Sequence, residues 1–334
     1  MTAITKTHID WEKSKLTNLN DNTGEYFSTK IASSFSEDAN AVVMCDDVLS
    51  ACQVLEKGSF QLFVSSPPYN IGKSYEKQVT LEQYLDWQTQ IASELVRLLS
   101  PRGSLVWQVG NFVDKGEVFP LDIYFYPIYK KLGLRLRNRI VWHFDHGLHA
   151  SKRLSGRYEV LLWFTKSDDY VFNLDPIRIP SKYPGKRHYK GDKIGQLSGN
   201  PLGKNPSDFW TLMQDEFERG IIDIPNVKSN HPEKTAHPCQ FPVELIERCV
   251  LSMSNENDWV LDPFGGVGSS MIAALKWKRR AVSIEQNSDY CDMTRERLKL
   301  LEHGRLKLRP LGKPVHQPTG REKVSKFPLE WEKE

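Results

Sequence analysis

The chain has 334 residues, 39% of them hydrophobic and 26% charged, with a formal net charge of +3. This size and composition fit a globular protein with a full α/β core and one additional module, and no apolar run approaches the roughly 18 residues that a membrane span needs. Because the N-terminus lacks the apolar segment of a secretion signal and the five cysteines form no CxxC pair, we expect a cytoplasmic protein with reduced thiols, no membrane partner and no metal.

Along the first half of the chain, short apolar runs alternate with segments whose apolar residues recur at helical spacing. Residues 1–38 are polar and are predicted to form an irregular N-terminal arm. Two prolines after a strand at residues 60–64 cannot continue a central strand, so the chain must turn there. The remaining pattern predicts strands at 41–45, 104–109, 134–144 and 158–165, the last two as an antiparallel pair, and helices at 81–99 and 121–132.

The character of the sequence changes between residues 168 and 236, which are rich in Pro, Gly, Asn and Lys and lack periodicity. Such a segment is either an inserted recognition module or a set of long functional loops. Alternating strands and helices elsewhere predict an α/β fold with a mainly parallel, doubly wound sheet, whose ligands bind at the carboxyl ends of the strands. The last third contains predicted helices at 242–254, 270–278 and 291–302, strands at 259–261 and 281–285, and a basic, loosely held tail at 303–334.

Residues 262–268 form a glycine-rich loop that follows one predicted strand and opens a helix. Glycines there let the backbone approach a ligand closely, and Glu285 at the end of the next strand suits an acid that accepts hydrogen bonds from ribose hydroxyls. Asp262 before the loop would repel a pyrophosphate but suits a positively charged amino-acid group, which S-adenosylmethionine offers together with an adenosine. The alternative is an ordinary strand-to-helix glycine turn without a ligand.

Ser66, Pro67, Pro68 and Tyr69 form a second conspicuous loop, at the end of the strand at 60–64. Methyl transfer to the exocyclic amine of a base needs hydrogen-bond acceptors for the amine protons and in-line placement of the reacting atoms. The Ser66 hydroxyl can accept, the rigid prolines aim a backbone carbonyl without spending an N–H, and Tyr69 offers a face on which an extruded base stacks. The alternative is a proline turn with Tyr69 packed in the core.

Together these two loops resemble the motifs of the N4-cytosine/N6-adenine DNA amino-methyltransferases. The loop from Ser66 to Tyr69 is similar to that family's catalytic motif, a Ser, Asp or Asn followed by Pro-Pro and an aromatic residue. The order of the two motifs along the chain, catalytic first and cofactor last, resembles the permuted beta group of the family. The family's cofactor motif, Asp-Pro-Phe-x-Gly-x-Gly, is matched by Asp262, Pro263, Phe264, Gly266 and Gly268.

Two shorter stretches extend the resemblance, which covers roughly residues 40–300. The stretch from His237 to Pro242 is similar to a His-Pro-x-Gln-x-Pro sequence that precedes the family's cofactor strand. Asp47 resembles the acidic residue that reaches the adenine amine of the cofactor. The preceding Cys45-Asp46 replaces the family's usual Gly-Asp, so Asp46 stays the alternative.

The resemblance implies a Rossmann-like, S-adenosylmethionine-dependent methyltransferase fold with an inserted target-recognition region, acting on double-stranded DNA. Its catalytic half would span residues 39–167, its target-recognition region 168–236 and its cofactor-binding half 237–302. The implied cofactor contacts are Asp47, Asp262, Pro263, Phe264, Gly266, Gly268 and Glu285. Residues 176–206 form a basic stretch, and the DNA contacts implied within it are Lys182, Lys186, Arg187, Lys190 and Lys193. A cognate restriction endonuclease is a candidate partner, and the enzyme is expected to be a monomer or a homodimer.

The target is either the N4 amine of cytosine or the N6 amine of adenine. Family members whose motif begins with Ser usually methylate cytosine, whereas those with Asp usually methylate adenine, so Ser66 favours cytosine. Asn70 directly after the tyrosine is commoner in the adenine enzymes and favours the opposite choice. We therefore expect N4-cytosine methylation, with N6-adenine methylation as the alternative.

Other functions stay open on the sequence alone. Cys239 lies in a Pro-Cys-Gln triplet like the nucleophilic motif of C5-cytosine methyltransferases, but its order relative to the glycine loop is reversed. A protein-amide or RNA methyltransferase could use a similar proline-tyrosine loop, and a non-catalytic relative would only bind DNA. His143, His146 and His149 suggest a metal-dependent or Ser-His-Asp hydrolase as another alternative, although no family motif includes them.

Overall fold

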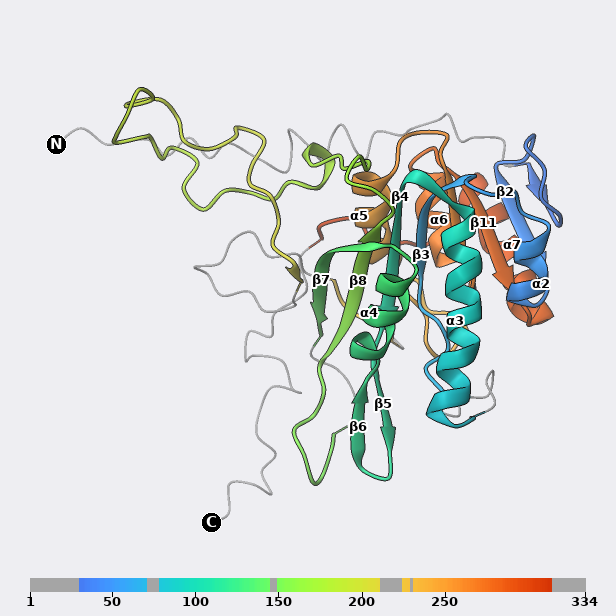
Figure 1. The fold of residues 1–334 in the computed structure, drawn as a ribbon. Coiled ribbons are helices and arrows are strands. Elements are labelled where there is room, and N and C mark those ends of the chain that lie inside the picture. The colour runs from blue at the N-terminus through green and yellow to red at the C-terminus, as the bar shows by residue number, and fades with distance from the viewer. Residues whose placement is uncertain (1–29, 71–77, 145–148, 211–223, 229–230, 314–334) are drawn as a thin grey trace, which may run out of the picture.

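A computed structural model describes residues 30–70, 78–144, 149–210, 224–228 and 231–313. Its centre is a sheet of nine strands in the order β1-β2-β11-β10-β3-β4-β8-β7-β9, and β5 and β6 form a separate hairpin (Figure 1). The strands are β1 (Ile31–Ala32), β2 (Ala41–Cys45), β3 (Phe60–Ser65), β4 (Leu99–Val109), β5 (Asn111–Asp114), β6 (Glu117–Pro120), β7 (Arg135–His143), β8 (Tyr158–Thr165), β9 (Phe209–Trp210), β10 (Trp259–Asp262) and β11 (Arg280–Glu285). The helices are α2 (Val48–Gln53), α3 (Leu81–Leu98), α4 (Leu121–Lys131), the 3-10 helix η1 (Asp175–Ile177), α5 (Val243–Met253), α6 (Ser269–Lys276) and α7 (Ser288–Glu302).

The sheet is parallel from β1 to β4, whereas β8 runs antiparallel to both of its neighbours, β4 and β7. Helices α2, α3 and α4 cover one face with side chains such as Ile91 and Phe125. Helices α5, α6 and α7 cover the other face with side chains such as Ile246 and Ile272. The doubly wound, mainly parallel fold and the antiparallel strand pair predicted from the sequence are therefore confirmed.

The prediction lacked β1, α2, the β5–β6 hairpin, η1 and β9, because each of these elements is too short to carry a periodic pattern. Strand β1 lies inside the predicted N-terminal arm and pairs with β2 through Ile31 and Ala41. Helix α2 has only six residues and starts at the Asp47 cap. The hairpin of β5 and β6 follows directly from the end of β4. Residues 1–29 of the predicted arm and 314–334 of the predicted tail lie outside the described residues.

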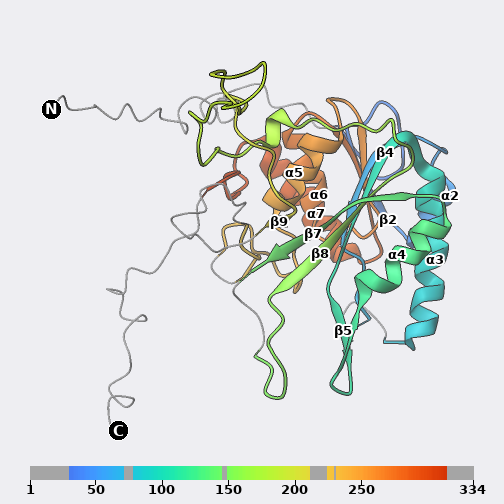
Figure 2. The ribbon, with the colours of Figure 1, turned by 60° about the vertical axis from the view of Figure 1, so that its left-hand side comes forward.

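The basic stretch at residues 176–206 forms an arm that projects from the edge of the sheet opposite the β5–β6 hairpin (Figure 1 and Figure 2). Just before the arm, the N–H of Val171 donates to the carbonyl of Arg102 near the start of β4. The N–H of Asn173 likewise donates to the carbonyl of Ser252 near the end of α5 (2.6 Å). The arm folds back on itself through two isolated β-bridges, Ile179–Lys204 and Arg187–Leu197.

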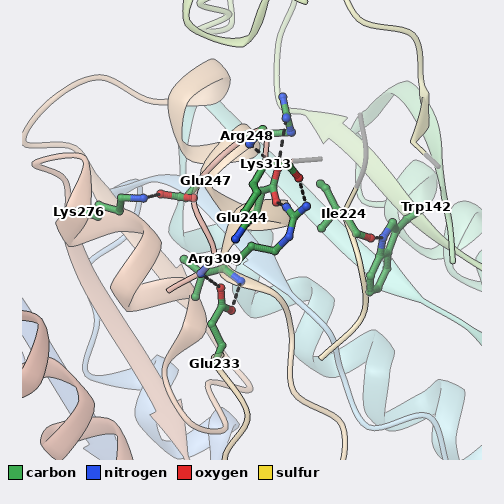
Figure 3. Close-up of polar contacts among 11 residues, drawn as sticks. Trp142, Ile224, Glu233, Glu244, Glu247, Arg248, Lys276, Arg309 and Lys313 are labelled. Carbon is green, nitrogen blue, oxygen red and sulfur yellow. Dashed lines mark hydrogen bonds and ion pairs between the residues drawn. The ribbon is translucent and has the colours of Figure 1, made fainter. Parts of the chain in front are cut away.

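A buried polar network ties the end of the chain to α5 (Figure 3). The guanidinium of Arg309 pairs with the Glu244 carboxylate, and both side chains are almost fully buried. The two oxygens of Glu233 accept from the backbone N–H groups of Arg309 (3.0 Å) and Val243 (2.9 Å). A buried pair of this kind is costly to break, because removing one partner strands the other charge. The prediction of a loosely held tail is therefore wrong for residues 303–313.

Candidate active site

The carboxyl ends of β3 and β10 open into one cavity of about 740 Å³. The Ser66–Tyr69 loop and residues 262–267 of the glycine loop both line it. Because β3 and β10 are neighbouring parallel strands, their ends meet at the same edge of the sheet. The Ser65 hydroxyl donates to Asp262 (2.6 Å) and so joins two strand ends that lie 197 positions apart in the chain.

The Ser66–Tyr69 loop is braced from α3. The hydroxyl oxygens of Ser66 and Tyr69 lie 3.0 Å apart and share a hydrogen bond. The carbonyl of Pro68 accepts from the Tyr84 hydroxyl (2.7 Å), so this carbonyl holds the loop in place. Pro67 is buried, whereas Ser66, Pro68 and Tyr69 are partly exposed toward the cavity. All four residues of the predicted loop therefore line the shared cavity.

The Tyr69 side chain lies between the ends of β4 and β8. A Cβ at Gly110 would stand 3.0 Å from Cε2 of Tyr69, so the glycine lets the ring lie against the backbone of β4. Glu159 on β8 accepts a hydrogen bond from the Gln108 amide of β4 and lies beside Tyr69, whose hydrogen-bonding influence lowers the pKa of the Glu159 carboxyl group. Burial raises the pKa of the Tyr69 phenol well above its usual value, which keeps Tyr69 protonated. Glu159, Gln108 and Tyr84 are not predicted as site residues from the sequence, although the first two are polar residues at the ends of otherwise apolar strands.

Asp262 anchors the glycine loop. Its side chain is 3% exposed and accepts from the hydroxyls of Ser65 and Ser270 and from the N–H of Phe264. Burial raises the pKa of the carboxyl group, while these three hydrogen bonds favour its charged form. We expected Asp262 to meet the charged amino-acid group of a cofactor. In the structure its carboxylate borders the cavity but is already engaged by three protein donors.

Gly266 and Gly268 both have a positive φ, 49° and 76°, which side chains with a Cβ rarely adopt. A Cβ at Gly268 would stand 2.5 Å from Cγ2 of Thr294, so this glycine allows the loop to pack against α7. A Cβ at Gly266 would stand 3.3 Å from Nε2 of His237, which lines the cavity. Glu285 accepts from the N–H of Gly266 (3.0 Å). Gly266 and Glu285 therefore border the cavity, whereas Gly268 allows the contact with α7.

The aromatic wall of the cavity comes from the same loop. Pro263 is buried beneath it, and the ring of Phe264 lies 5.7 Å from the ring of Trp87 and 6.0 Å from that of Trp107. Phe264 and Trp87 both line the cavity. A flat aromatic ligand such as an adenine therefore has apolar partners on this side.

Asp47 and Asp46 lie at the end of β2, and both line the cavity. Asp47 is the N-cap of α2, and its carboxylate accepts from the N–H groups of Leu49 (2.9 Å) and Ser50 (3.2 Å). Asp46 is exposed and accepts from the N–H of Asp47 (2.7 Å). Because Asp47 is committed to the helix, the alternative residue Asp46 is the better placed of the two to meet a ligand.

The cavity fits S-adenosylmethionine. The hydroxyl of Ser269, in the first turn of α6, is buried and has no hydrogen-bond partner within the described protein. Together with the positive end of the helix, this donor suits a carboxylate such as that of the methionine group. Glu285 suits the ribose hydroxyls. Phe264 suits the apolar face of an adenine, and Asp46 suits the adenine amine.

The predicted DNA contacts lie elsewhere. Lys182, Lys186, Arg187, Lys190 and Lys193 are all exposed on the arm, and none of them borders the cavity. Two of them lie over aromatic rings of the arm itself, Lys182 over Tyr183 and Lys190 over Tyr189. Among the described residues, the cations that border the cavity are Arg153, Lys228 and Lys234.

The three histidines that suggested a hydrolase do not form a common site among the described residues. His143 on β7 stacks on Phe209 with ring centroids 6.3 Å apart, His149 is exposed, and His146 lies outside the described residues. Within the described ranges, no group of three or more His, Cys, Asp or Glu side chains could hold a metal ion. None of the helices described combines the length and the apolar character that crossing a membrane requires.

Comparison with known proteins agrees with this geometry. The model of the N6/N4 methyltransferase family, described as DNA methylase, matches residues 60–296. The Type II methyltransferase M.BglII from Bacillus subtilis is 47% identical over 264 residues, which are 79% of this chain and 70% of that protein. M.ScaI from Streptomyces caespitosus is 34% identical over 79% of this chain and 83% of that protein. A solved structure, described as a DNA modification methylase from Thermus thermophilus complexed with S-adenosyl-L-methionine, is 27% identical with a TM-score of 0.53, covering 82% of this chain and 99% of that one.

Proposed function

Because this chain belongs to the N6/N4 DNA methylase family, it is an S-adenosylmethionine-dependent DNA amino-methyltransferase, and we propose that it methylates N4 of cytosine within a specific duplex sequence. The observation that supports this proposal most is the single cavity shared by the Ser66–Tyr69 loop and the glycine loop. The family acts on exocyclic amines, so C5-cytosine methylation through Cys239, protein-amide methylation and hydrolysis are set aside.

In the proposed mechanism, this chain positions and polarises the target amine. S-adenosylmethionine supplies an electrophilic methyl group when it is bound. The Ser66 hydroxyl accepts a hydrogen bond from the amine, which draws electron density onto the nitrogen. The Tyr69 ring stacks on the extruded base, and the cavity walls exclude water. Orientation of this kind is worth about 7–11 kcal/mol of the barrier in favourable cases.

The structure gives Asn70 contacts that do not involve the target base. It has a positive φ of 58°, and its amide group donates to the carbonyl of Val79 (2.7 Å) and accepts from the Val79 N–H (2.8 Å). These two bonds give Asn70 a structural role at the start of α3 that does not depend on the target base. The sequence feature that favoured adenine therefore loses weight, and Ser66 at the head of the motif is left favouring cytosine.

The product identifies the target base directly. We expect duplex DNA treated with the purified protein and S-adenosylmethionine to yield N4-methylcytosine when its nucleosides are separated by mass spectrometry. A heat-denatured protein sample provides the background. N6-methyladenine as the product would replace the proposed base but keep the family chemistry, and 5-methylcytosine would contradict both.

We place the target-recognition region at residues 168–236, between the catalytic half at 39–167 and the cofactor-binding half at 237–302. The arm supports this division because its exposed cations alternate with exposed tyrosines, a combination that suits phosphates and base edges. It leaves the sheet at the end opposite the β5–β6 hairpin (Figure 2), and none of its residues lines the cavity. Its contacts would therefore reach phosphates at some distance from the extruded base.

Charge removal on the arm tests this placement. We expect Lys186→Ala, Arg187→Ala and Lys190→Ala in one protein to weaken duplex binding and to lower the slope of log affinity against log salt by up to about 3. Fluorescence anisotropy over a salt series measures both quantities. A control protein with Lys57→Ala, Lys130→Ala and Lys131→Ala loses the same net charge from exposed sites away from the arm and the cavity. Equal losses in the two proteins would mean that only the overall charge matters.

The names of the relatives support a role in restriction-modification. M.BglII and M.ScaI are both named Type II methyltransferases. We infer that this enzyme protects a short duplex sequence from a cognate endonuclease and acts as a monomer or a homodimer. Resistance of enzyme-treated DNA to cleavage, and sedimentation of the full chain, measure these two properties.

A further inference from the structure

Four polar side chains form a connected chain on one wall of the cavity. Ser66 and Tyr69 come from the loop after β3, Gln108 from β4 and Glu159 from β8, and all four line the cavity. We propose that Glu159 is the terminal proton acceptor of a relay that leads from the target amine through the hydroxyls of Ser66 and Tyr69. This inference rests on the proposed amine methylation, but it does not depend on which base carries the amine.

The contacts along this chain are continuous. The hydroxyl oxygens of Ser66 and Tyr69 are 3.0 Å apart, and Tyr69 lies beside the Glu159 carboxylate, whose pKa its hydrogen-bonding influence lowers. Gln108 donates its amide N–H to the same carboxylate and fixes it from the side of β4. Gly110 is needed for the arrangement, because a Cβ there would stand 3.0 Å from the Tyr69 ring and 3.5 Å from a Glu159 oxygen.

The carboxylate fixes the direction of every hydrogen bond in the chain. An ionised carboxylate can only accept, so Tyr69 must donate its proton to Glu159. The Tyr69 oxygen then accepts from Ser66, whose own proton is committed to Tyr69. Ser66 lines the cavity and keeps lone pairs that are not used by Tyr69, which is the polarity needed to accept a hydrogen bond from an amine N–H.

The proton balance of the reaction requires an acceptor of this kind. When the amine nitrogen forms its bond to the methyl carbon, the carbon–sulfur bond breaks and its electron pair stays on sulfur as a thioether. The nitrogen gains a positive charge and must release one proton. That proton passes to Ser66 as the Ser66 proton moves to Tyr69 and the Tyr69 proton moves to Glu159. Protonated Glu159 later returns its proton to water.

The surroundings of Glu159 suit this task at neutral pH. Burial raises the pKa of the Glu159 carboxyl group to about 7, although the hydrogen bonds from Gln108 and Tyr69 lower it. An acceptor with a pKa near the working pH is the most effective, because it is both available and basic. Among the described residues, the other titratable groups that line the cavity are the acids Asp46, Asp47, Asp262 and Glu285, the bases Arg153, Lys228, Lys234 and His237, and also Cys239, Tyr158 and Tyr290.

The test is the pH dependence of Glu159→Gln, which keeps the shape of the side chain but cannot accept the proton. In the native enzyme, Glu159 must be ionised before it can accept, so kcat should rise with pH through about 7 and level off above it. Glu159→Gln should lower kcat by about 10²–10⁴-fold and remove this ionisation from the profile. Its affinities for S-adenosylmethionine and for duplex DNA should remain those of the native enzyme.

A second variant and a spectroscopic measurement separate the relay from simple support of the loop. Tyr69→Phe keeps the ring but breaks the chain, so adding it to Glu159→Gln should cause little further loss. Carboxyl carbon NMR of Glu-labelled protein should show a resonance that titrates near pH 7 and that is missing in Glu159→Gln. Glu56→Gln, at an exposed glutamate outside the cavity, is the matched control and should change neither profile nor kcat.

Two results would overturn the relay. One is a Glu159→Gln enzyme that keeps the native kcat and the native pH profile. The other is full additivity of the losses in the Tyr69→Phe, Glu159→Gln double variant. Failure of the proposed base is a separate outcome, because a native enzyme that yields N6-methyladenine would still have to release an amine proton.

Discussion

Ser66→Ala is expected to lower kcat by about 10²–10³-fold while the dissociation constant for S-adenosylmethionine stays unchanged. The hydroxyl is the group placed to accept from the target amine, and its loss also removes the hydrogen-bond partner of the Tyr69 hydroxyl. The glycine loop is held separately, through Asp262 and Glu285, so cofactor binding does not depend on Ser66. Single-turnover kinetics with saturating DNA, together with calorimetric titration of the cofactor, measure the two quantities.

Tyr69→Ala is the companion variant. It removes both the stacking face and the relay hydroxyl, so we expect a loss at least as large as that of Ser66→Ala. Because Tyr69 packs on Gly110, its removal also leaves a gap beside β4, and a thermal melting curve should accompany the kinetics. Native turnover in both variants would remove the catalytic assignment of this loop.

Gly266→Val is expected to weaken S-adenosylmethionine binding by at least about tenfold, which corresponds to about 1.4 kcal/mol. The backbone at Gly266 has a φ of 49°, which residues with a Cβ rarely adopt. The Cβ of the new side chain would stand 3.3 Å from Nε2 of His237, so the rest of the valine would enter the space between the loop and His237. Calorimetric titration measures the affinity, and the melting temperature reports any loss of folded stability. Native affinity for the cofactor would show that Gly266 does not border its site.

The neighbouring glycine provides a matched control. A Cβ at Gly265 would stand 1.7 Å from the hydroxyl oxygen of Ser283, a buried residue of β11, so Gly265→Ala forces the loop away from the sheet. We expect this variant to lose thermal stability first and cofactor affinity only as a consequence. If Gly265→Ala and Gly266→Val lose stability and cofactor affinity in the same proportion, the contact of Gly266 with His237 has no separate role in cofactor binding.

The family and its chemistry followed from two short stretches of sequence. Residues 66–69 and 262–268 each end a strand, and their composition alone indicates an amine-directed loop and a glycine-rich cofactor loop. Both lie where an α/β sheet binds its ligands, at strand ends, so their meeting could be expected before any coordinates. The shared cavity confirms that expectation.

Roles that depend on hydrogen-bond partners could not be predicted in the same way. Asp47 matched a cofactor position but caps α2, because the carboxylate of a residue at a helix start is captured by the nearest free N–H groups. Asp262 matched a ligand contact but is held by Ser65, a partner 197 positions away. The basic arm lies between the two motifs in the sequence. The segment that leads into it, however, is hydrogen-bonded to the backbone carbonyls of Arg102 and Ser252, which do not line the cavity.

By itself, the sequence determined which chemistry this protein performs and which cofactor class it uses, because those properties reside in contiguous residues at strand ends. Only the tertiary structure decided which side chains are free to act. Glu159 is distant in the chain from Ser66 and Tyr69, and it reaches them because β8 inserts antiparallel beside β4. Pairing of distant strands places its carboxylate against the tyrosine hydroxyl, and no local pattern in the chain encodes that pairing.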